Sequence, residues 1–350
     1  MISIADVVKL DGEETISRVK GLDQLSGSKV LVTGAAGFLG SYLIDVFVWM
    51  NEILLTEDIH VVAVDNYVHG TPERVMRWEG RSDVSLRRFD VVQDTLDEHF
   101  DFVFHLASIA SPVFYRKYPI ETIEANVFGL KKMLELGRKS GAQVVYMSSS
   151  EVYGDPSPEN IPTSEHYWGN VSFTGPRACY DESKRLGETL CQAYHQQEGV
   201  EIKVVRPFNV YGPGQSLSDG RIIPDIVRAL VNNHDIQLFG DGKATRSFCY
   251  VSDFVGGLFS VVLHGVSGEA YNVGNDDEMT ILELATIASG LRDPSISITF
   301  SVSDDPSYLV DNPQRRCPDL AKLNALGWAP SIGVRTGLRK TLESYLGQGS

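Results

Sequence analysis

VLVTGAAGFLGSYLIDVF, residues 30–47, joins an apolar run, a glycine-rich turn and an amphipathic segment. Glycine lets such a turn be tight and lets the backbone approach a pyrophosphate, whose charge then lies at the N-terminus of the following helix. Similarly spaced glycines also occur where a helix simply packs on a strand, but the strand-turn-helix context favours dinucleotide binding. The residues that we expect to contact the dinucleotide here are Gly34, Gly37, Phe38, Leu39 and Gly40.

The next apolar run, VVAVDNY at residues 61–67, ends in an acid. An acid at this place accepts hydrogen bonds from the ribose hydroxyls and favours NAD over NADP. Asp65 lies somewhat further beyond Gly40 than the usual distance of about 20 residues, and the long connection at residues 49–60 absorbs the difference. Further residues predicted to bind the cofactor from neighbouring strand ends, where ordinary strand termini are the alternative, are Asn66, Asp90, Val91 and Ala107.

Short runs rich in β-branched residues alternate with helix-length segments, at residues 29–34, 60–65, 102–107, 143–150 and 202–208. This alternation predicts an α/β fold with a doubly wound parallel (Rossmann) sheet covered by helices on both faces. After residue 207 the sequence becomes rich in Gly, Pro and Asp, which indicates a smaller C-terminal substrate-binding domain. We expect a helical N-terminal extension at 1–27, an NAD-binding domain at 28–207 with a return segment at about 243–274, and a substrate-binding domain at 208–242 and 275–346.

The composition narrows the class of partner. With a formal net charge of -15 over 350 residues, the chain lacks the excess of Lys and Arg that nucleic acids and anionic membranes attract. Its four cysteines have neither metal-binding nor disulfide-scaffold spacing, and no run of apolar residues is long enough for a membrane span. We therefore expect a cytoplasmic protein without a metal site, whose partner is a small molecule.

Ser149 lies at the end of the fourth run and Glu151 directly after it, and Tyr180 and Lys184 lie four residues apart in a predicted helix. Residues beyond the carboxyl ends of parallel strands face the ligand crevice, and side chains at i and i+4 share a helix face. A cation beside a phenol favours the phenolate, which makes Tyr180 a candidate base for a hydroxyl proton while hydride leaves the same carbon. The alternative is an ordinary exposed helical turn, but the glycine loop upstream favours the catalytic interpretation.

Four motifs, TGAAGFLG, SSSEVYG, YDESK and RPFNVYGP, together resemble the extended short-chain dehydrogenase/reductase family that acts on sugar nucleotides. The longer pattern around GPRACYDESKR, followed by DGR and TRSFCYVSD, is similar to the UDP-glucuronate decarboxylase (UDP-xylose synthase) branch over residues 29–345. The resemblance implies a lyase that oxidises a UDP-linked sugar transiently at C4 and regenerates its NAD. It also implies a homodimer that pairs through two helices from each subunit.

The same resemblance implies roles for individual side chains. Tyr180 is expected to act at the sugar 4-hydroxyl, with Lys184 tuning it and holding the nicotinamide ribose while Ser149 shares the hydrogen bond. Glu151 is expected beside the sugar ring as a second acid/base or an orienting group. Guanidinium forks suit diphosphate, uracil and carboxylate groups. The residues expected to bind the substrate are Tyr115, Asn209, Arg221, Arg246 and Arg316.

Alternatives stay open at this point. A 4-epimerase of the same sugar nucleotides uses the same tyrosine, lysine and NAD, and only the shape of the pocket separates it from a decarboxylase. A 4,6-dehydratase needs an Asp-Glu pair, whereas Ser150 precedes Glu151 here. A non-catalytic dinucleotide-binding protein tends to lose the tyrosine or the lysine, and both are present. Two segments, 65–75 and 301–319, depart from the decarboxylase pattern near the cofactor phosphates and the substrate-pocket lid.

Overall fold

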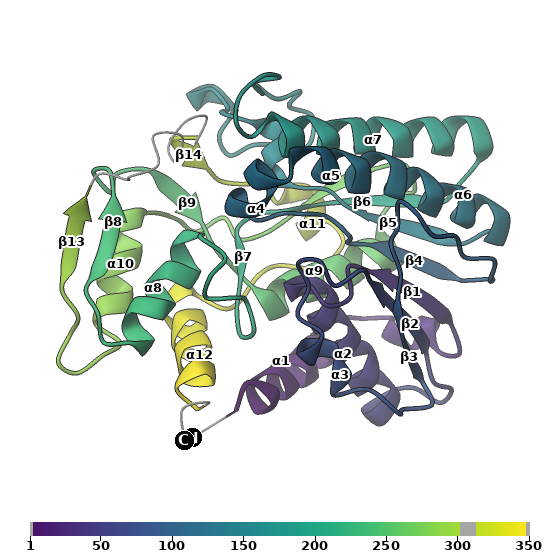
Figure 1. Ribbon diagram of the computed structural model, residues 1–350, viewed down its shortest axis with the longest axis horizontal. Helices are drawn as coiled ribbons and strands as arrows, with labels where there is room; N and C mark the ends of the chain where they lie inside the picture. The colour runs from purple at the N-terminus through teal and green to yellow at the C-terminus, as the bar shows by residue number, and fades with distance from the viewer. Residues whose placement is uncertain (1–2, 302–312, 348–350) are drawn as a thin grey trace.

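The computed structural model describes residues 3–301 and 313–347, and a seven-stranded sheet forms the centre of this part (Figure 1). Its strands are β1 Lys29–Thr33, β2 His60–Asp65, β3 Val84–Arg88, β4 Phe102–His105, β5 Gln143–Met147, β6 Ile202–Pro207 and β11 Ala270–Val273. They lie in the order β11-β6-β5-β4-β1-β2-β3, and all neighbours are parallel. The predicted doubly wound sheet is therefore confirmed, and each predicted run contributes a strand.

The strands outside the five predicted apolar runs, β3 and β11, lie at the two edges of this sheet. The strand end predicted just before Asp90 and Val91 is that of β3. The sequence of β3, VSLRR, has charged side chains and is only partly buried, and β11 has four residues. An edge strand needs apolar side chains less than a central strand does, so its sequence carries a weaker strand signal.

Helices cover both faces of the sheet (Figure 1). One face holds α2 Phe38–Ile53 and α9 Val251–His264, and the other holds α6 Leu130–Ser140 and α7 Ala178–Glu198. The two faces form separate apolar clusters, because alternate side chains of a strand point to opposite sides: Val30 and Val32 belong to one cluster and Leu31 to the other. Shorter helices before α6 are α3 Glu73–Met76, α4 Pro112–Lys117 and α5 Pro119–Glu124.

The chain beyond β6 builds small sheets and helices beside the carboxyl edge of the central sheet (Figure 1). Its strands are β7 Val210–Tyr211, β8 Ile236–Phe239, β9 Thr245–Ser247, β10 Cys249–Tyr250, β12 Glu278–Thr280, β13 Ile298–Ser301 and β14 Arg315–Arg316. Its helices, apart from α9, are α8 Ile222–Val231, α10 Ile281–Ser289, α11 Ala321–Asn324 and α12 Val334–Leu346. The chain returns to the central sheet with α9 and β11. Residues 302–312 of the predicted lid segment lie outside the described residues.

The N-terminal helix α1, Ile4–Arg18, packs on the body of the protein. Asp11, in the middle of α1, is fully buried. Its carboxylate accepts hydrogen bonds from Tyr42 of α2 at 3.0 Å, from Tyr250 of β10 at 2.6 Å and from the Lys340 ammonium of α12 at 2.7 Å. The segment predicted as an extension is therefore a helix that joins the first and last parts of the chain.

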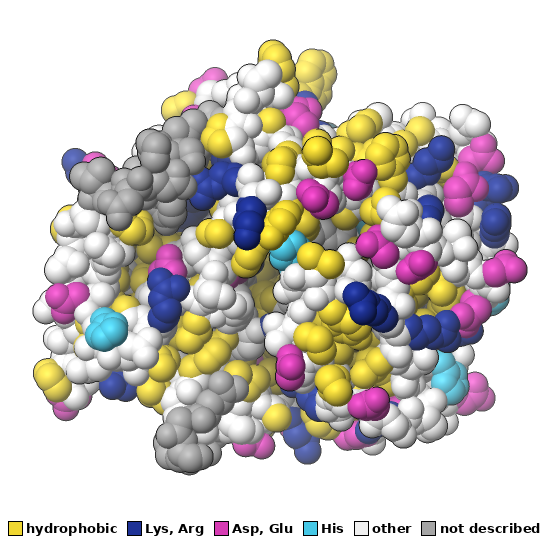
Figure 2. All heavy atoms as spheres, viewed as in Figure 1, with side chains coloured by type: hydrophobic (Ala, Val, Ile, Leu, Met, Phe, Trp, Pro, Cys, Tyr) yellow, Lys and Arg dark blue, Asp and Glu magenta, His cyan; other side chains and the backbone are white. Residues whose placement is uncertain are grey.

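The surface agrees with the acidic composition. On the face drawn in Figure 2, Lys and Arg are interspersed with Asp and Glu. Within the described ranges, no helix has both the length and the apolar character needed to cross a membrane. The four cysteines are free thiols, and the described residues contain no cluster of three or more His, Cys, Asp or Glu side chains that could hold a metal ion.

Candidate active site

A cleft of about 470 Å³ opens at the carboxyl ends of the central strands and extends to the elements that follow β6. In a doubly wound sheet this edge is where ligands bind. The predicted site residues that line the cleft are Gly34, Gly37, Phe38, Leu39, Gly40, Tyr115, Ser149, Glu151, Tyr180, Lys184, Asn209, Arg221, Arg246 and Arg316. The structure therefore brings the glycine loop, the Tyr-Lys pair and the arginines to one cavity.

The glycine loop is as tight as its sequence predicts. Gly34 has φ 69°, and a Cβ there would lie 2.8 Å from the backbone nitrogen of Ala107. A Cβ on Gly40 would lie 2.2 Å from the carbonyl oxygen of Gly34, so neither position has room for a side chain. Helix α2 begins at Phe38 without a side-chain cap, which leaves its first N–H groups to face an anion.

Asp65, Asn66, Asp90, Val91 and Ala107 are not among the residues that line this cleft. The Asp65 carboxylate accepts hydrogen bonds from the backbone of Ala36 at 3.0 Å and Tyr67 at 2.8 Å. Burial raises the pKa of Asp65 and these hydrogen bonds oppose the rise. The Asn66 amide donates to Asp90 at 3.2 Å, which links the ends of β2 and β3.

Two further residues predicted to bind the cofactor make packing and backbone contacts within the protein. Val91 packs against Gly129, where a Cβ would lie 2.7 Å from its methyl group. The backbone N–H of Ala107 donates to the Thr33 hydroxyl at 3.2 Å. Adenosine contacts from these residues, and from Asn66 and Asp90, stay a prediction.

Lys184 lies one helical turn after Tyr180 on α7 and is buried, with 2% of its surface exposed. Its ammonium donates to the carbonyl oxygen of Met147, at the end of β5, at 2.8 Å. The ammonium lies 5.7 Å from the centroid of the Tyr180 ring and 5.1 Å from that of Tyr146. Burial lowers the pKa of Lys184 to about 7, although nearby Cys191 and Glu188 oppose the shift.

Tyr180 stacks on Tyr115 of α4, with ring centroids 5.2 Å apart and ring planes inclined by 12°. Burial raises the pKa of Tyr180 to about 12, and a hydrogen bond with the Ser149 side chain opposes the rise. The Tyr115 hydroxyl is buried and finds no hydrogen-bond partner among the described residues. This orphan group lies in the cleft beside the proposed base, where a polar ligand could satisfy it.

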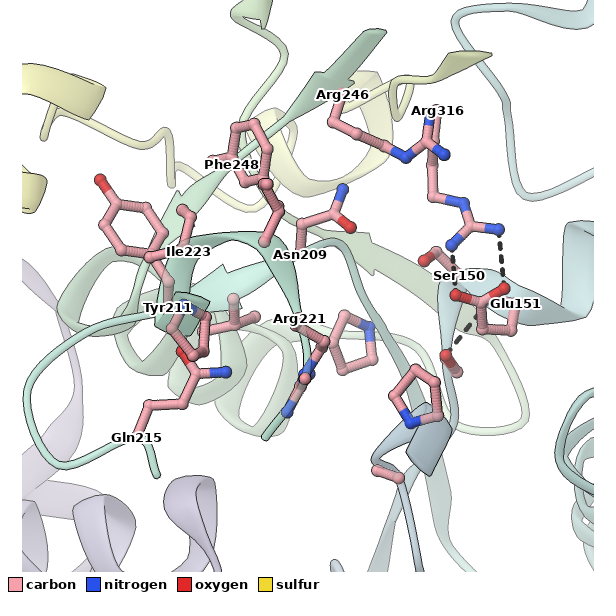
Figure 3. A pocket seen from close by; sticks show the side chains of 18 of the residues that line it. Ser150, Glu151, Asn209, Tyr211, Gln215, Arg221, Ile223, Arg246, Phe248 and Arg316 are labelled. Carbon is pink, nitrogen blue, oxygen red and sulfur yellow. Dashed lines mark hydrogen bonds and ion pairs between the residues drawn. The ribbon is translucent and has the colours of Figure 1, made fainter. Parts of the chain in front are cut away.

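Glu151 forms ion pairs with two guanidinium groups, those of Arg316 and Arg177; Figure 3 shows the pair with Arg316. Arg316 of β14 forms a two-pronged ion pair with its carboxylate, one bond of which measures 2.7 Å, and Arg177 at the start of α7 forms another ion pair. Burial opposes the charge of Glu151, but Arg177 and Arg316 together hold its pKa well below the ordinary value. Glu151 is therefore ionised at neutral pH in this site.

Arg177 and Asp181 are residues that the sequence analysis did not assign. Arg177 Nε lies 3.6 Å from the Asp181 carboxylate on the same helix, so the two side chains extend the charge cluster around Glu151. Burial and the charge of Glu151 raise the pKa of Asp181, against the opposing effect of Arg177. Both residues lie inside GPRACYDESK, and their i, i+4 spacing was the available signal.

The remaining predicted substrate residues project from the elements after β6 (Figure 3). Arg246 is buried and donates to the carbonyl oxygens of Thr245 at 2.7 Å and Gln314 at 3.2 Å. Burial and the charge of Arg316 lower the pKa of Arg246 to about 9. Further polar or aromatic residues of the cleft that the sequence analysis missed are Tyr211, Gln215 and Phe248.

Asn209 and Arg221 both have protein partners as well as a place in the cleft. Asn209 has φ 40° and donates to the Ser247 carbonyl oxygen at 2.8 Å, so it also fulfils the turn-forming role that was the alternative. The Arg221 guanidinium donates to Asp219 at 2.8 Å, and its side chain is 40% exposed. Direct substrate contact by either residue stays a prediction.

Known proteins are similar to this chain in sequence. Residues 30–274 match the model of the NAD dependent epimerase/dehydratase family. The chain is 41% identical over 318 residues to UDP-glucuronic acid decarboxylase 3 of Arabidopsis thaliana, covering 91% of this chain and 89% of that protein. It is 40% identical over 328 residues to UDP-glucuronic acid decarboxylase 1 of Xenopus tropicalis, covering 93% and 74%.

Solved structures resemble the whole arrangement. A UDP-glucuronic acid 4-epimerase from Bacillus cereus, in complex with UDP-glucuronic acid and NAD, matches with a TM-score of 0.76 at 25% identity, covering 91% of this chain and 99% of that one. A UDP-glucose 4-epimerase from Thermotoga maritima matches with a TM-score of 0.79 at 22% identity, over 91% and 99%, which supports the fold. This chain belongs to the NAD dependent epimerase/dehydratase family, the extended short-chain dehydrogenases/reductases that its motifs predicted.

Proposed function

We propose that this enzyme is a UDP-glucuronate decarboxylase, which converts UDP-glucuronate to UDP-xylose and carbon dioxide with NAD as cofactor. The observation that carries the proposal is one cleft in which the glycine loop, Tyr180 with Lys184, and two arginines around Glu151 converge. Identity of about 40% to UDP-glucuronic acid decarboxylases over more than nine-tenths of the chain supports the choice of substrate.

The residues at the carboxyl edge of β1 and β2 fit NAD. The N-terminus of α2 and the side-chain-free surface of Gly34 and Gly40 would hold the pyrophosphate. Asp65 would accept hydrogen bonds from the hydroxyls of one ribose. The buried Lys184 ammonium uses one N–H group for its hydrogen bond to the Met147 carbonyl oxygen, and its other N–H groups would bind the second ribose. Bound NAD supplies a hydride acceptor for C4 of the sugar and, after decarboxylation, the hydride donor.

Tyr180 is the proposed base for the sugar 4-hydroxyl. A phenol whose pKa burial raises to about 12 is a poor base at neutral pH, so its surroundings must favour the phenolate when the substrate is bound. The hydrogen bond from Ser149 and the positive charge of Lys184 both act in that direction. After decarboxylation the same phenol returns its proton to the oxygen at C4.

The arginines provide the environment that decarboxylation needs. Oxidation at C4 places a ketone β to the C6 carboxylate, and the C5–C6 bond then breaks with its electron pair moving into an enolate. Arg177 and Arg316 would attract and orient the substrate carboxylate, while Tyr180 and Ser149 would stabilise the negative charge that develops on the C4 oxygen. One proton is added at C5, so UDP-glucuronate and a proton give UDP-xylose and carbon dioxide. Because Glu151 is ionised between the arginines, we assign it an orienting role.

The nucleotide half of the substrate would lie against the elements after β6. The cleft there contains Asn209, Arg221 and Arg246, which offer amide and guanidinium donors to uracil and diphosphate. Tyr115, with its unpartnered hydroxyl beside Tyr180, would face the sugar. These assignments rest on the place of each side chain in the cleft and on the sequence resemblance.

A 4-epimerase is the second candidate, because the Bacillus cereus epimerase with this fold was solved with UDP-glucuronic acid and NAD. The two activities are separated by incubating the purified protein with UDP-glucuronate and NAD and measuring the mass of the sugar nucleotide. Loss of carbon dioxide supports the decarboxylase, an isomer of unchanged mass supports the epimerase, and an unchanged substrate contradicts both.

We also propose a homodimer in the cytoplasm. Exposed apolar side chains lie on α5, on the turn after it and on α7, namely Ile120, Ile123, Phe128 and Leu186, and pairing of these helices between two subunits would bury them. We keep the division into an NAD-binding domain at 28–207 and about 243–274 and a substrate-binding domain at 208–242 and 275–346 as a proposal. Light scattering of the purified protein tests the dimer, and a monomeric mass contradicts it.

A further inference from the structure

Three side chains on one face of α7 form hydrogen bonds with three successive residues at the end of β5. The helix residues, one turn apart from each other, are Tyr180, Lys184 and Glu188, and the strand-end residues are Met147, Ser148 and Ser149. Lys184 donates to the Met147 carbonyl at 2.8 Å, and Tyr180 shares a side-chain hydrogen bond with Ser149. The spacing of four residues places all three helix side chains on one face. The proposed mechanism uses two of them and leaves Glu188 without a role.

Glu188 binds both the strand end and the next strand. Its carboxylate accepts a hydrogen bond from the Ser148 hydroxyl and a two-pronged ion pair from Arg206 of β6, with bonds of 2.8 and 2.5 Å. Arg206 is buried and also donates to the Tyr153 hydroxyl at 2.6 Å, which in turn donates to Asn272 of β11 at 2.7 Å. The Glu188 carboxylate is therefore held from several sides and cannot move without disturbing β5 and β6.

We propose that Glu188 is a positioning residue for the reaction: with Arg206 it holds the end of β5 against α7 so that Ser149 and Lys184 meet Tyr180. Ser148 is the link, because its backbone is continuous with both Met147 and Ser149. Two charge-assisted hydrogen bonds in a buried site fix an orientation more firmly than neutral ones do. The inference rests on the proposed function in one respect, the assignment of Tyr180 as the base.

Glu188 also acts on the charge of Lys184. The titratable groups that face this ammonium are Glu188, Cys191 and Tyr180 on α7, His105 on β4 and Tyr146 on β5. Burial raises the pKa of the Cys191 thiol well above its usual value and lowers the pKa of His105 to about 3, so both are neutral near pH 7. Among these groups Glu188 is the carboxylate, and its negative charge raises the pKa of Lys184, which favours the protonated lysine.

The direction of the pH effect follows. Replacing Glu188 by Gln removes the charge that supports the Lys184 ammonium and loosens Ser149, and both changes disfavour the Tyr180 phenolate. The acid limb of the kcat/KM profile should therefore move to higher pH by about half to one unit. At a fixed pH on the acid side of the profile, this shift means that kcat/KM of the variant should be about three- to tenfold lower than that of the wild type. KM for UDP-glucuronate should change by less than about twofold, because Glu188 does not touch the substrate.

The experiment compares pH profiles of kcat/KM for the NAD-loaded wild type, Glu188→Gln, Ser148→Ala and the control Glu182→Gln. Glu182 lies on the exposed side of α7 beside Arg185, so its variant should keep the wild-type profile. A shift of the acid limb in Glu188→Gln but not in Glu182→Gln supports the proposal. An unshifted limb in Glu188→Gln overturns it, even if the turnover number falls. If Glu188→Gln does not fold, Ser148→Ala takes its place, because it removes only the hydroxyl that binds Glu188. A shifted acid limb in Ser148→Ala then supports the proposal, and an unshifted limb overturns it.

A substrate-free measurement separates this inference from the proposed function. Tyrosinate absorbance of the NAD complex is titrated with and without Tyr180→Phe, and the difference reports the ionisation of Tyr180 alone. Glu188→Gln should raise that pKa whether or not UDP-glucuronate is turned over. An unchanged tyrosinate titration contradicts the role of Glu188, whereas a wild type that fails to convert UDP-glucuronate contradicts the proposed function.

Discussion

Tyr115 and Tyr180, which both line the cleft, stack on each other with ring centroids 5.2 Å apart and planes inclined by 12°. The contact fixes the plane of the proposed base from a helix, α4, that is distant from α7 in sequence. It also places the unpartnered Tyr115 hydroxyl within the cleft.

Replacing Tyr115 tests the stacked pair. An aromatic pair contributes about 0.5–1.5 kcal/mol beyond burial, so Tyr115→Ala should lower kcat by about three- to tenfold because Tyr180 loses its orientation. Tyr115→Phe keeps the ring and should keep kcat within about twofold while raising KM if the hydroxyl binds the sugar. Steady-state kinetics with UDP-glucuronate measures both. Equal kcat losses in the two variants would show that the ring contact is not what matters.

Tyr180→Phe should leave NAD binding unchanged and remove most turnover. The ring and its stacking remain, but the proton acceptor is lost, and general bases contribute about 10²- to 10⁴-fold. NAD affinity is measured by titration and turnover by the mass of the product. Tyr194→Phe is the matched control, since Tyr194 lies on the same helix with its hydroxyl bonded to Glu135 at 2.6 Å. Full activity of Tyr180→Phe would falsify the assigned base.

Asp181 should reduce stability at neutral pH. Burial and the charge of Glu151 raise the pKa of Asp181 in the folded protein, so the folded state binds a proton more tightly than the unfolded state does. The cost is absent below the ordinary pKa of about 3.8 and grows as pH rises through the folded pKa. Asp181→Asn should therefore raise the free energy of unfolding by about 1 kcal/mol or more near pH 8. In acid, urea denaturation should give the same stability for variant and wild type; a constant difference at all pH values contradicts this assignment.

Asp11 should be critical for stability because it joins α1 to α2, β10 and α12. Asp11→Ala leaves two buried tyrosine hydroxyls without an acceptor and leaves Lys340 with only Glu14, which should cost about 3 kcal/mol. Burial raises the pKa of Asp11, so the neutral Asp11→Asn should lose less. Urea denaturation gives the values, with the exposed Asp23→Ala as control. A loss in Asp11→Ala no larger than in Asp23→Ala would mean that α1 is not anchored through this carboxylate.

Much of the nucleotide half of the molecule could be predicted from its sequence. The central strands carry continuous apolar runs because both their faces are buried, and the spacing of Gly34, Gly37 and Gly40 between a strand and a helix favours a tight turn. Tyr180 and Lys184 were found by helical periodicity, which is a local property. Of the edge strand β3 only the end before Asp90 could be predicted, because its charged, partly exposed side chains do not form an apolar run.

The charge cluster could not be predicted in the same way. Glu151 and Arg316 are 165 residues apart, and their ion pair exists only because β14 is brought beside the end of β5. No local pattern marks such a pair. Arg177 was within reach of the spacing argument, but an arginine at a helix start usually has a solvent-exposed partner, and its burial is a tertiary property.

The ion pair between Glu151 and Arg316 has a further consequence for how the cleft is filled. It ties β14 to the segment that follows β5, and it gives the arginines of the cleft an anionic partner from the protein itself. A uronate entering the cleft would bring a second carboxylate that competes with Glu151 for the guanidinium groups, whereas a neutral hexose brings only hydroxyl acceptors, which bind a guanidinium group more weakly. Selection between the two sugars would then occur through competition with a side chain of the protein itself.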